Sequence, residues 1–239
     1  MEIFQSFYYS TIAYRQKEIE YTLNKNLNND VVKYIHLFIE DNDYVLFNKS
    51  IFITHDNYNK IKLVNFKGQP TYKDLFTYCS KLINTICCIC NSDIEFRIEQ
   101  NDIRLLDNLY NKKLIYFLTR HEHDMSCPLI KKFGGSHDAF IFHSNMLQCN
   151  LNNTDLSFIN YIQNTSGIEA ILTLFFIEHL NYNILNPCYQ IKLIHHHSSR
   201  VRLWNKTQTG KRIIGYTSLK PLNLKHGVHN KHMIYPIKL

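Results

Sequence analysis

Short apolar runs alternate along the chain with longer stretches in which apolar residues recur every three or four positions. The runs are rich in β-branched and aromatic residues and predict strands at residues 3–9, 31–40, 62–66, 114–118 and 139–142. The helical spacing predicts helices at residues 15–28, 71–84, 103–110 and 166–179. Thr71, with Asp74 three residues later, has the pattern of a capping box. Strands that alternate with helices indicate an α/β fold with a mixed, mostly parallel sheet flanked by helices.

The stretch from Ile86 to Phe96 is the most apolar of these segments and carries no charge before Asp93. A nearly continuous apolar run is typical of a parallel strand that helices cover on both faces. The sequence Asn91-Ser92-Asp93 interrupts it, at the kind of strand end where open α/β sheets bind ligands. We therefore expect Asp93 to hold a divalent cation and, through it, an anionic ligand. The alternative is a polar turn that only ends the strand.

Residues 184–194 are predicted to be extended, and Pro187 confines their first part to an edge or a bend. They lead directly into a cluster of histidines and arginines at residues 195–202. On an extended segment His195 and His197 share one face, where two imidazoles can bind a cation or a diphosphate. Arg200 and Arg202 likewise share a side and can bind phosphate. The alternative for the cluster is a solvated basic loop.

Glu169 opens the helix predicted at residues 166–179. Ser166 and Glu169 have the spacing of a capping box, which is a sufficient structural reason for the acid. The positive end of the helix also favours an ionised carboxylate, which can accept a proton from a hydroxyl group at neutral pH. The two roles are compatible.

The composition is that of a globular protein with a preference for anionic partners, but it does not decide the function. The 239 residues are 45% hydrophobic and 20% charged, as in an ordinary globular domain, and the net charge of +7 favours anionic partners. The seven cysteines are odd in number, and unpaired thiols indicate a reducing, cytoplasmic setting. Cys87 and Cys90 would point to opposite faces of a strand, so we interpret this pair as core thiols and not as metal or redox ligands. No signal peptide is evident, and no apolar segment approaches the ~20 residues that span a bilayer.

Several common nucleotide-binding and hydrolase signatures are missing. Neither a glycine-rich Rossmann turn nor a P-loop occurs, and G-x-S-x-G is absent. A nucleotide would therefore have to be held by a cation and side chains. A nucleic-acid-binding or nucleotidyl-transferring protein remains an alternative because of the charge, although no recognised nucleic-acid motif is present.

The order of these pieces resembles that of a small family of GT-A-fold, family 2-like glycosyltransferases found in giant viruses, bacteria and plants. Asn91-Ser92-Asp93 is similar to a DxD-type motif, and Gly167-Ile168-Glu169-Ala170 to the G-E-D start of a catalytic helix. His195-x-His197-x-Ser199-x-x-Arg202 resembles a closing H-x-H-x-S-x-x-R. Three further stretches also match the family: residues 15–19, 70–74 and 136–142.

Three positions depart from the family pattern. Asn91 replaces the first acid of a strict DxD, Ala170 replaces the second acid of the acidic pair, and Phe140 replaces a tryptophan. These departures leave open a catalytically degenerate protein that binds nucleotide sugars without transferring them.

The resemblance implies a metal-dependent transferase with a GT-A-like catalytic domain at residues 1–204 and a basic C-terminal extension at residues 205–239. The metal, Mn²⁺ or Mg²⁺, would be held by Asp93, His195 and His197. Glu169 would deprotonate the acceptor, with Asp138 as the second candidate, and a single base indicates inversion. The donor, a UDP- or GDP-linked sugar, would contact six further residues: Phe7, Tyr8, Arg15, Asp74, Ser199 and Arg202. The acceptor would be a glycan or glycoconjugate, with no nucleic acid as a partner.

Overall fold

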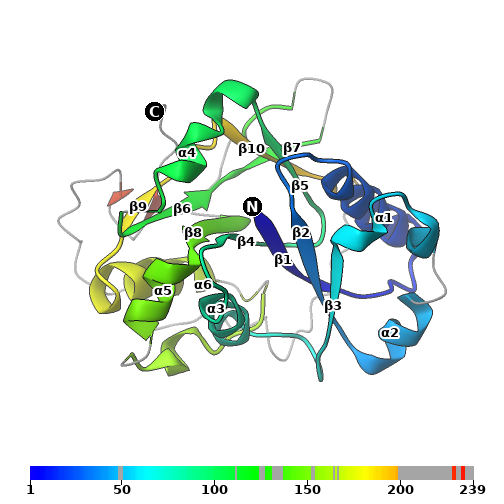
Figure 1. Cartoon of the computed structure of the whole chain (residues 1–239), viewed down its shortest axis with the longest axis horizontal. Helices are drawn as coiled ribbons and strands as arrows, with labels where there is room; N and C mark the ends of the chain where they lie inside the picture. The colour runs from blue at the N-terminus through cyan, green and yellow to red at the C-terminus, as the bar shows by residue number, and fades with distance from the viewer. Residues whose placement is uncertain are drawn as a thin grey trace.

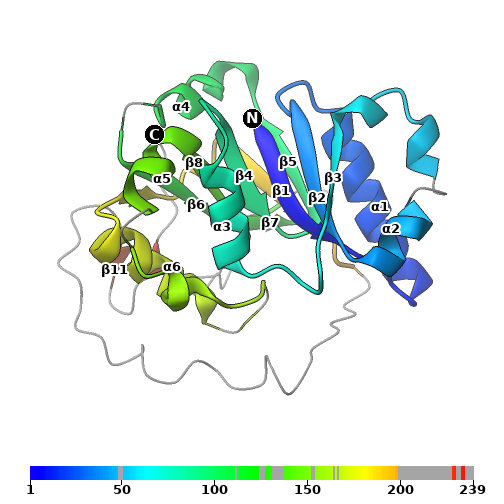
Figure 2. The same ribbon diagram turned by 60° about the horizontal axis from the view of Figure 1, so that its bottom comes forward.

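A computed structural model describes residues 1–47, 51–110, 112–123, 127–130, 137–151, 154–163, 165, 167–198, 228–229 and 233–234. The order of strands in the larger sheet is β3, β2, β1, β4, β8, β6 and β9, and Figure 2 shows the first four side by side. Their bounds are Ile61–Asn65, Tyr34–Ile39, Glu2–Phe7, Ile86–Cys90, Ala139–His143, Leu114–Leu118 and Asn183–Leu185. Only β8 runs antiparallel to its neighbours among these strands. The predicted α/β class with a mostly parallel sheet is confirmed.

A second sheet consists of three strands, with β10 (Ile191–His195) between β5 (Ile94–Ile98) and β7 (Arg120–Glu122). Strand β10 pairs antiparallel with β5 and parallel with β7. The short strands β11 (Val228–His229) and β12 (Met233–Ile234) form a separate antiparallel pair. The second sheet matters for the site because β5 begins directly after Asp93 and β10 ends at His195.

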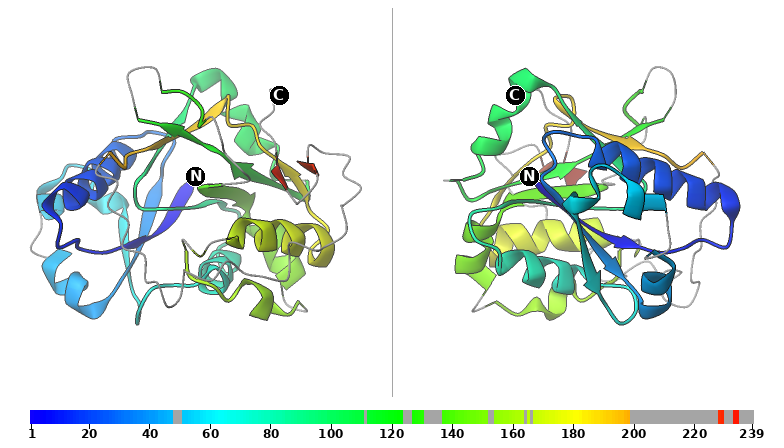
Figure 3. Two further views of the ribbon diagram at one scale, coloured as in Figure 1. Left: turned by 180° about the vertical axis from the view of Figure 1, so that it is seen from behind. Right: turned by 45° about the vertical axis from the view of Figure 1, so that its right-hand side comes forward.

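Helices cover both faces of the large sheet (Figure 1). Their bounds are α1 Ala13–Leu27, α2 Asp41–Phe47, α3 Tyr72–Ser80, α4 Arg104–Asp107, α5 Ser144–Leu151 and α6 Ile168–Leu174, which a π-helical turn continues over Phe175–His179. Short 3₁₀ turns lie at Ile51–Thr54, Tyr58–Lys60, Gln100–Asp102 and Leu156–Ile159. Figure 3 shows α1, in blue, well apart from α3, α5 and α6 across the strands.

Side chains alternate between two cores, because successive residues of a strand point to opposite faces. In β1, Ile3 and Phe7 pack with α1, whereas Phe4 packs with α3 on the other face. In β4, Cys88 and Cys90 join the first core, and Cys87 and Ile89 join the second. Cys87 and Cys90 therefore lie on opposite faces, as the spacing predicted. Both faces of β1 and β4 are buried, which explains why these strands are apolar at nearly every position.

Most predicted elements form, but several bounds were wrong. The capping box is present, since Thr71 accepts from the Asp74 backbone N–H and Asp74 accepts from that of Thr71. However, α3 ends at Ser80 rather than residue 84, because the N–H groups of Lys81 and Leu82 turn to the carbonyls three residues earlier, and the chain then leaves the helix through Asn84, which has a positive φ of 52°. The helix predicted at residues 103–110 has a single α-helical turn, α4. The charged stretch after residue 119 begins with the short strand β7, which the hydrophobic pattern did not predict.

The single extended segment predicted at residues 184–194 is also wrong. Pro187 begins a turn, in which the Pro187 carbonyl accepts hydrogen bonds from the N–H groups of Gln190 and Ile191. The turn separates β9, at the edge of the large sheet, from β10, in the small one. The histidines therefore do not continue a strand of the main sheet. No helix in the described part of the chain is both long and apolar enough to cross a membrane.

Candidate active site

The site lies at the carboxyl ends of β1 and β4, where the order in which successive strands are added to the large sheet changes from one side of β1 to the other. Strands β2 and β3 are added on one side of β1, and β4 is added on the other. The carboxyl ends of β1 and β4 therefore flank a topological switch point, the usual ligand position in open α/β sheets. The turn after β4 carries Asp93, and the loop after β1 leads to Arg15 in the first turn of α1.

Asp93 is buried, with 4% of its surface exposed, and three cationic or potentially cationic groups meet one of its oxygens. Its Oδ2 atom lies 2.8 Å from Arg15 Nη2, 3.2 Å from His195 Nε2 and 3.2 Å from His197 Nδ1. Burial would raise the pKa of Asp93, but hydrogen bonds from both histidines and the charge of Arg15 hold it well below its ordinary value. Asp93 is therefore a carboxylate at neutral pH.

The two histidines reach Asp93 because β10 is extended up to His195, so that every second side chain points to the same side. His196 points away and pairs with Glu95 at 2.7 Å, in agreement with the predicted alternation. The backbone N–H of His196 also donates to the Asp93 carbonyl at 2.9 Å, which fixes the histidine segment against the turn after β4.

Arg15 is buried and uses all three nitrogens of its guanidinium group. Nε donates to Tyr8 Oη at 3.2 Å, Nη1 to Glu18 at 3.2 Å, and Nη2 to Asp93. Burial would lower the pKa of Arg15, but the charge of Asp93 raises it, so the group stays cationic. Arg15 was predicted to contact the donor, and that contact stays a prediction; within the described residues Arg15 pairs with the candidate metal ligand Asp93.

Asp93, His195 and His197 each offer one donor atom, and the three atoms lie within 4.8 Å of one another. One carboxylate and two imidazoles suit a borderline divalent ion such as Mn²⁺ or Zn²⁺, whereas Mg²⁺ prefers oxygen ligands throughout. The Nε2 atom of His197 is buried and makes no hydrogen bond within the described part of the chain. The residues present therefore fit a cation, which would share Asp93 with Arg15.

A second polar cluster surrounds Asp138, which directly precedes β8 and is 7% exposed. Arg120 Nη1 lies 3.3 Å from both Asp138 oxygens, and Asn91 Nδ2 donates to Oδ1 at 3.3 Å. Asn91 occupies the position of the first acid in a strict DxD. Its side chain donates to Asp138 and adds no second carboxylate to Asp93.

Glu169 lies in the first turn of α6 and is half-buried. Burial raises the pKa of Glu169 to about 7, and the negative charge of Asp138 adds to the rise. The predicted capping box is not how α6 begins, because Gly167 is the N-cap in the left-handed conformation (φ 87°), with no side-chain cap. Ser166 lies outside the described residues.

Arg120 and Glu122 connect the two clusters, and sequence reasoning did not identify either residue. Arg120 Nε donates to Glu122 Oε1 at 3.1 Å, and Glu122 Oε2 lies 3.7 Å from His195 Nδ1. A chain of charges therefore runs from Asp138 through β7 to the histidines. Alternating charges on a short strand are common on solvated surfaces, so no motif distinguishes this pair.

The other predicted ligand contacts differ in their surroundings. Phe7 is 2% exposed in the core, so a contact from this position would have to come from its backbone. Tyr8 hydrogen-bonds Arg15 beside the site. The carboxylate of Asp74 accepts from both the backbone N–H and the hydroxyl of Thr71. Ser199 and Arg202 lie outside the described residues.

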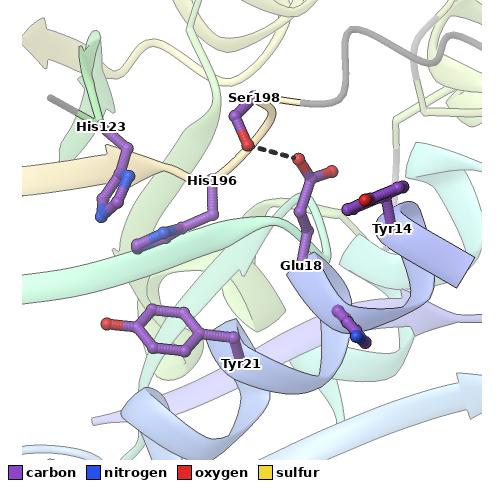
Figure 4. Close-up of a pocket in the computed structure, with 7 residues that line it drawn as sticks. Tyr14, Glu18, Tyr21, His123, His196 and Ser198 are labelled. Carbon is purple, nitrogen blue, oxygen red and sulfur yellow. Dashed lines mark hydrogen bonds between the residues drawn. The ribbon is translucent and has the colours of Figure 1, made fainter.

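A pocket of about 530 Å³ lies on the side of the histidine segment, residues 195–198, that faces away from Asp93 (Figure 4). Side chains of α1 form one wall and His196 and Ser198 form the other. Ser198 donates to Glu18 at 3.1 Å across the pocket edge.

No protein-family model matches the sequence, and no curated protein matches it either. Solved structures do resemble the fold. TarS of S. aureus (residues 1–349), in complex with UDP-GlcNAc, is 11% identical with a TM-score of 0.51, over 84% of this chain and 61% of that TarS chain. The mannosyltransferase PcManGT of Pyrobaculum calidifontis, in complex with GDP-Man and Mn²⁺, is 11% identical with a TM-score of 0.53, over 83% of this chain and 57% of PcManGT.

This chain thus spans about three fifths of the length of the two solved chains that it resembles. At such low identity the likeness concerns the arrangement of strands and helices and not the activity. The chain has the α/β fold of the GT-A nucleotide-sugar transferases.

Proposed function

We propose that this protein is a metal-dependent glycosyltransferase that moves a sugar from a UDP- or GDP-linked donor to a hydroxyl group of a glycan or glycoconjugate. One observation carries the proposal: a buried carboxylate after β4 meets two histidines from more than a hundred residues downstream, in a GT-A fold. TarS and PcManGT bind nucleotide sugars, and PcManGT does so with Mn²⁺, which supports the same ligand class here.

In this proposal Asp93, His195 and His197 hold the cation and orient the donor diphosphate at the switch point. The bound cation would neutralise charge that develops on the leaving nucleoside diphosphate. Arg15 keeps Asp93 ionised and in place, and Tyr8 and Glu18 in turn fix Arg15. Because the donor set contains two imidazoles, we expect Mn²⁺ to bind more tightly than Mg²⁺.

Glu169 is the proposed general base, with Asp138 as the second candidate. A pKa of about 7 is well suited to taking a proton from an acceptor hydroxyl at neutral pH. Asp138 is less suited, because Arg120 and Asn91 already occupy its oxygens. Its charge nevertheless raises the pKa of Glu169. A single base acting opposite the leaving group would invert the anomeric centre.

A second function has one observation in its favour. Arg15 already balances the charge of Asp93 at 2.8 Å, as would suit a protein that binds nucleotides without a metal and without transfer. Thermal shift measurements with nucleoside diphosphates, with and without Mn²⁺, separate the two. Metal-dependent stabilisation followed by sugar transfer supports the enzyme. Metal-independent stabilisation without hydrolysis or transfer of the donor supports the binding protein.

A further inference from the structure

The pocket beyond the histidine segment is lined by four rings (Figure 4). Tyr14 and Tyr21 come from the outer side of α1 and are 76% and 45% exposed, and Tyr14 is the most exposed tyrosine in the described part of the chain. His123 and His196 face them, with their ring centroids 4.2 Å apart. The ring of His196 also lies 4.9 Å from that of Tyr21. Aromatic rings therefore line both the buried part of the pocket, at His196, and its open edge, at Tyr14.

Polar groups stand at the edge of these rings. Lys17 and Glu18 come from α1, and Ser198 closes the pocket from the other side. Glu18 accepts from Ser198 and from Arg15, so its carboxylate is held in a fixed position. The pocket thus combines ring faces with a carboxylate, a hydroxyl and an ammonium group in one concave surface.

The pocket is a different place from the cation cluster, although the same short segment forms both. His195 and His197 point toward Asp93, whereas His196 and Ser198 line the pocket. The ion pair of His196 with Glu95 keeps its ring turned to that side. Asp138 and Glu169 are absent from the pocket lining.

We propose that this pocket binds carbohydrate, as a subsite separate from the catalytic centre. A pyranose ring has an apolar C–H face and a rim of hydroxyl groups. An open tyrosine ring matches the first, and fixed carboxylate and hydroxyl groups match the second, because few but well-placed polar groups give such pockets their specificity. Tyr14, as the most exposed ring, provides the stacking platform, and Glu18 and Ser198 provide partners for the hydroxyls.

The charges of the pocket do not favour an anionic ligand. Glu18 is paired with Arg15, and Glu95 behind His196 is paired with Arg97, so the carboxylates and cations around the pocket are balanced and no excess of positive charge is available to a phosphate. A neutral oligosaccharide suits such a lining. That the ligand is a glycan which the enzyme modifies rests on the proposed function; that the pocket binds a sugar ring rests on the residues named above.

Titration of the full chain with neutral oligosaccharides tests the proposal, with maltohexaose, cellohexaose and chitohexaose as probes and isothermal titration calorimetry as the measurement. We expect at least one probe to bind, and Tyr14→Ala to weaken its binding about tenfold or more. Tyr21→Ala is the second variant. Tyr189→Ala is the matched control, because Tyr189 is 43% exposed outside the pocket and its loss should leave affinity unchanged.

Binding of no probe, or equal binding by wild type and Tyr14→Ala, would overturn the proposal. So would a Tyr14-dependent response to UDP or inorganic phosphate in place of oligosaccharide. Failure of the proposed function looks different: Tyr14-dependent oligosaccharide binding would persist while no nucleotide-sugar donor is turned over. Asp93→Asn is expected to retain full oligosaccharide affinity, which shows that the two sites are separate.

Discussion

Replacing Arg15 with glutamine should tighten Mn²⁺ binding, because the arginine and a cation would compete for Asp93. Arg15 Nη2 lies 2.8 Å from Asp93 Oδ2. A cation on the same oxygen, at a bond length of about 2.1 Å, would lie about 5 Å from the guanidinium group. The repulsion between charges of +2 and +1 at that distance is about 1.7 kcal/mol in water and about 7 kcal/mol at an effective dielectric constant near 20.

Even the lower figure corresponds to more than a tenfold change in affinity, so we expect Arg15→Gln to tighten Mn²⁺ binding about tenfold or more. The metal-free variant should in turn be less stable by about 2 kcal/mol, since it loses charged hydrogen bonds in a buried position. Mn²⁺ affinity can be measured by the electron paramagnetic resonance signal of the free ion.

Lys17→Gln is the matched control, because it removes one positive charge from the same helix at an exposed position. It should change Mn²⁺ affinity by less than about threefold, as screening weakens exposed charges. An Arg15→Gln variant that is folded and binds Mn²⁺ as weakly as wild type, or more weakly, would refute the competition.

Three further predictions concern the base and the fold. Glu169→Gln should lower kcat by about 10² or more without weakening Mn²⁺-dependent nucleotide binding, measured by steady-state kinetics and titration; an unchanged kcat would exclude Glu169 as the base. Because Glu169 must be ionised to act and its pKa is about 7, kcat for the wild type should rise with pH through about 7 and then level off, and a rate that is flat from pH 6 to 8 would contradict the assignment. Thr71→Ala should cost about 1 kcal/mol in unfolding free energy, measured by urea denaturation, because it removes the cap of α3; no loss would argue against the observed capping box.

The parts of this structure that follow from local periodicity could be predicted. The apolar runs became β1, β2, β3, β6 and β8, and Thr71 with Asp74 marked the start of α3. The shared side of His195 and His197 followed from the two-residue repeat of an extended chain. These features depend on neighbouring residues only, so a single sequence carries enough information for them.

The remaining features depend on contacts between distant segments. Nothing in residues 94–98 indicates that they leave the main sheet and pair with β10, and nothing near Pro187 reveals that β9 and β10 belong to different sheets. The partners of Arg15 and the bridge through Arg120 arise from the same long-range arrangement. Charged side chains tolerate many surroundings, so their sequence positions do not predict which of them will be buried together.

The cation site at Asp93 is tested most directly by the thermal stabilisation of wild type and Asp93→Asn by UDP and GDP, each with and without Mn²⁺. We expect one of the two nucleotides to raise the wild-type Tm only when Mn²⁺ is present. Asp93→Asn should remain folded by circular dichroism and lose this metal-dependent increase. An equal Mn²⁺-dependent increase in wild type and in folded Asp93→Asn would contradict the claim that Asp93 and the two histidines form the cation site of a nucleotide-sugar transferase.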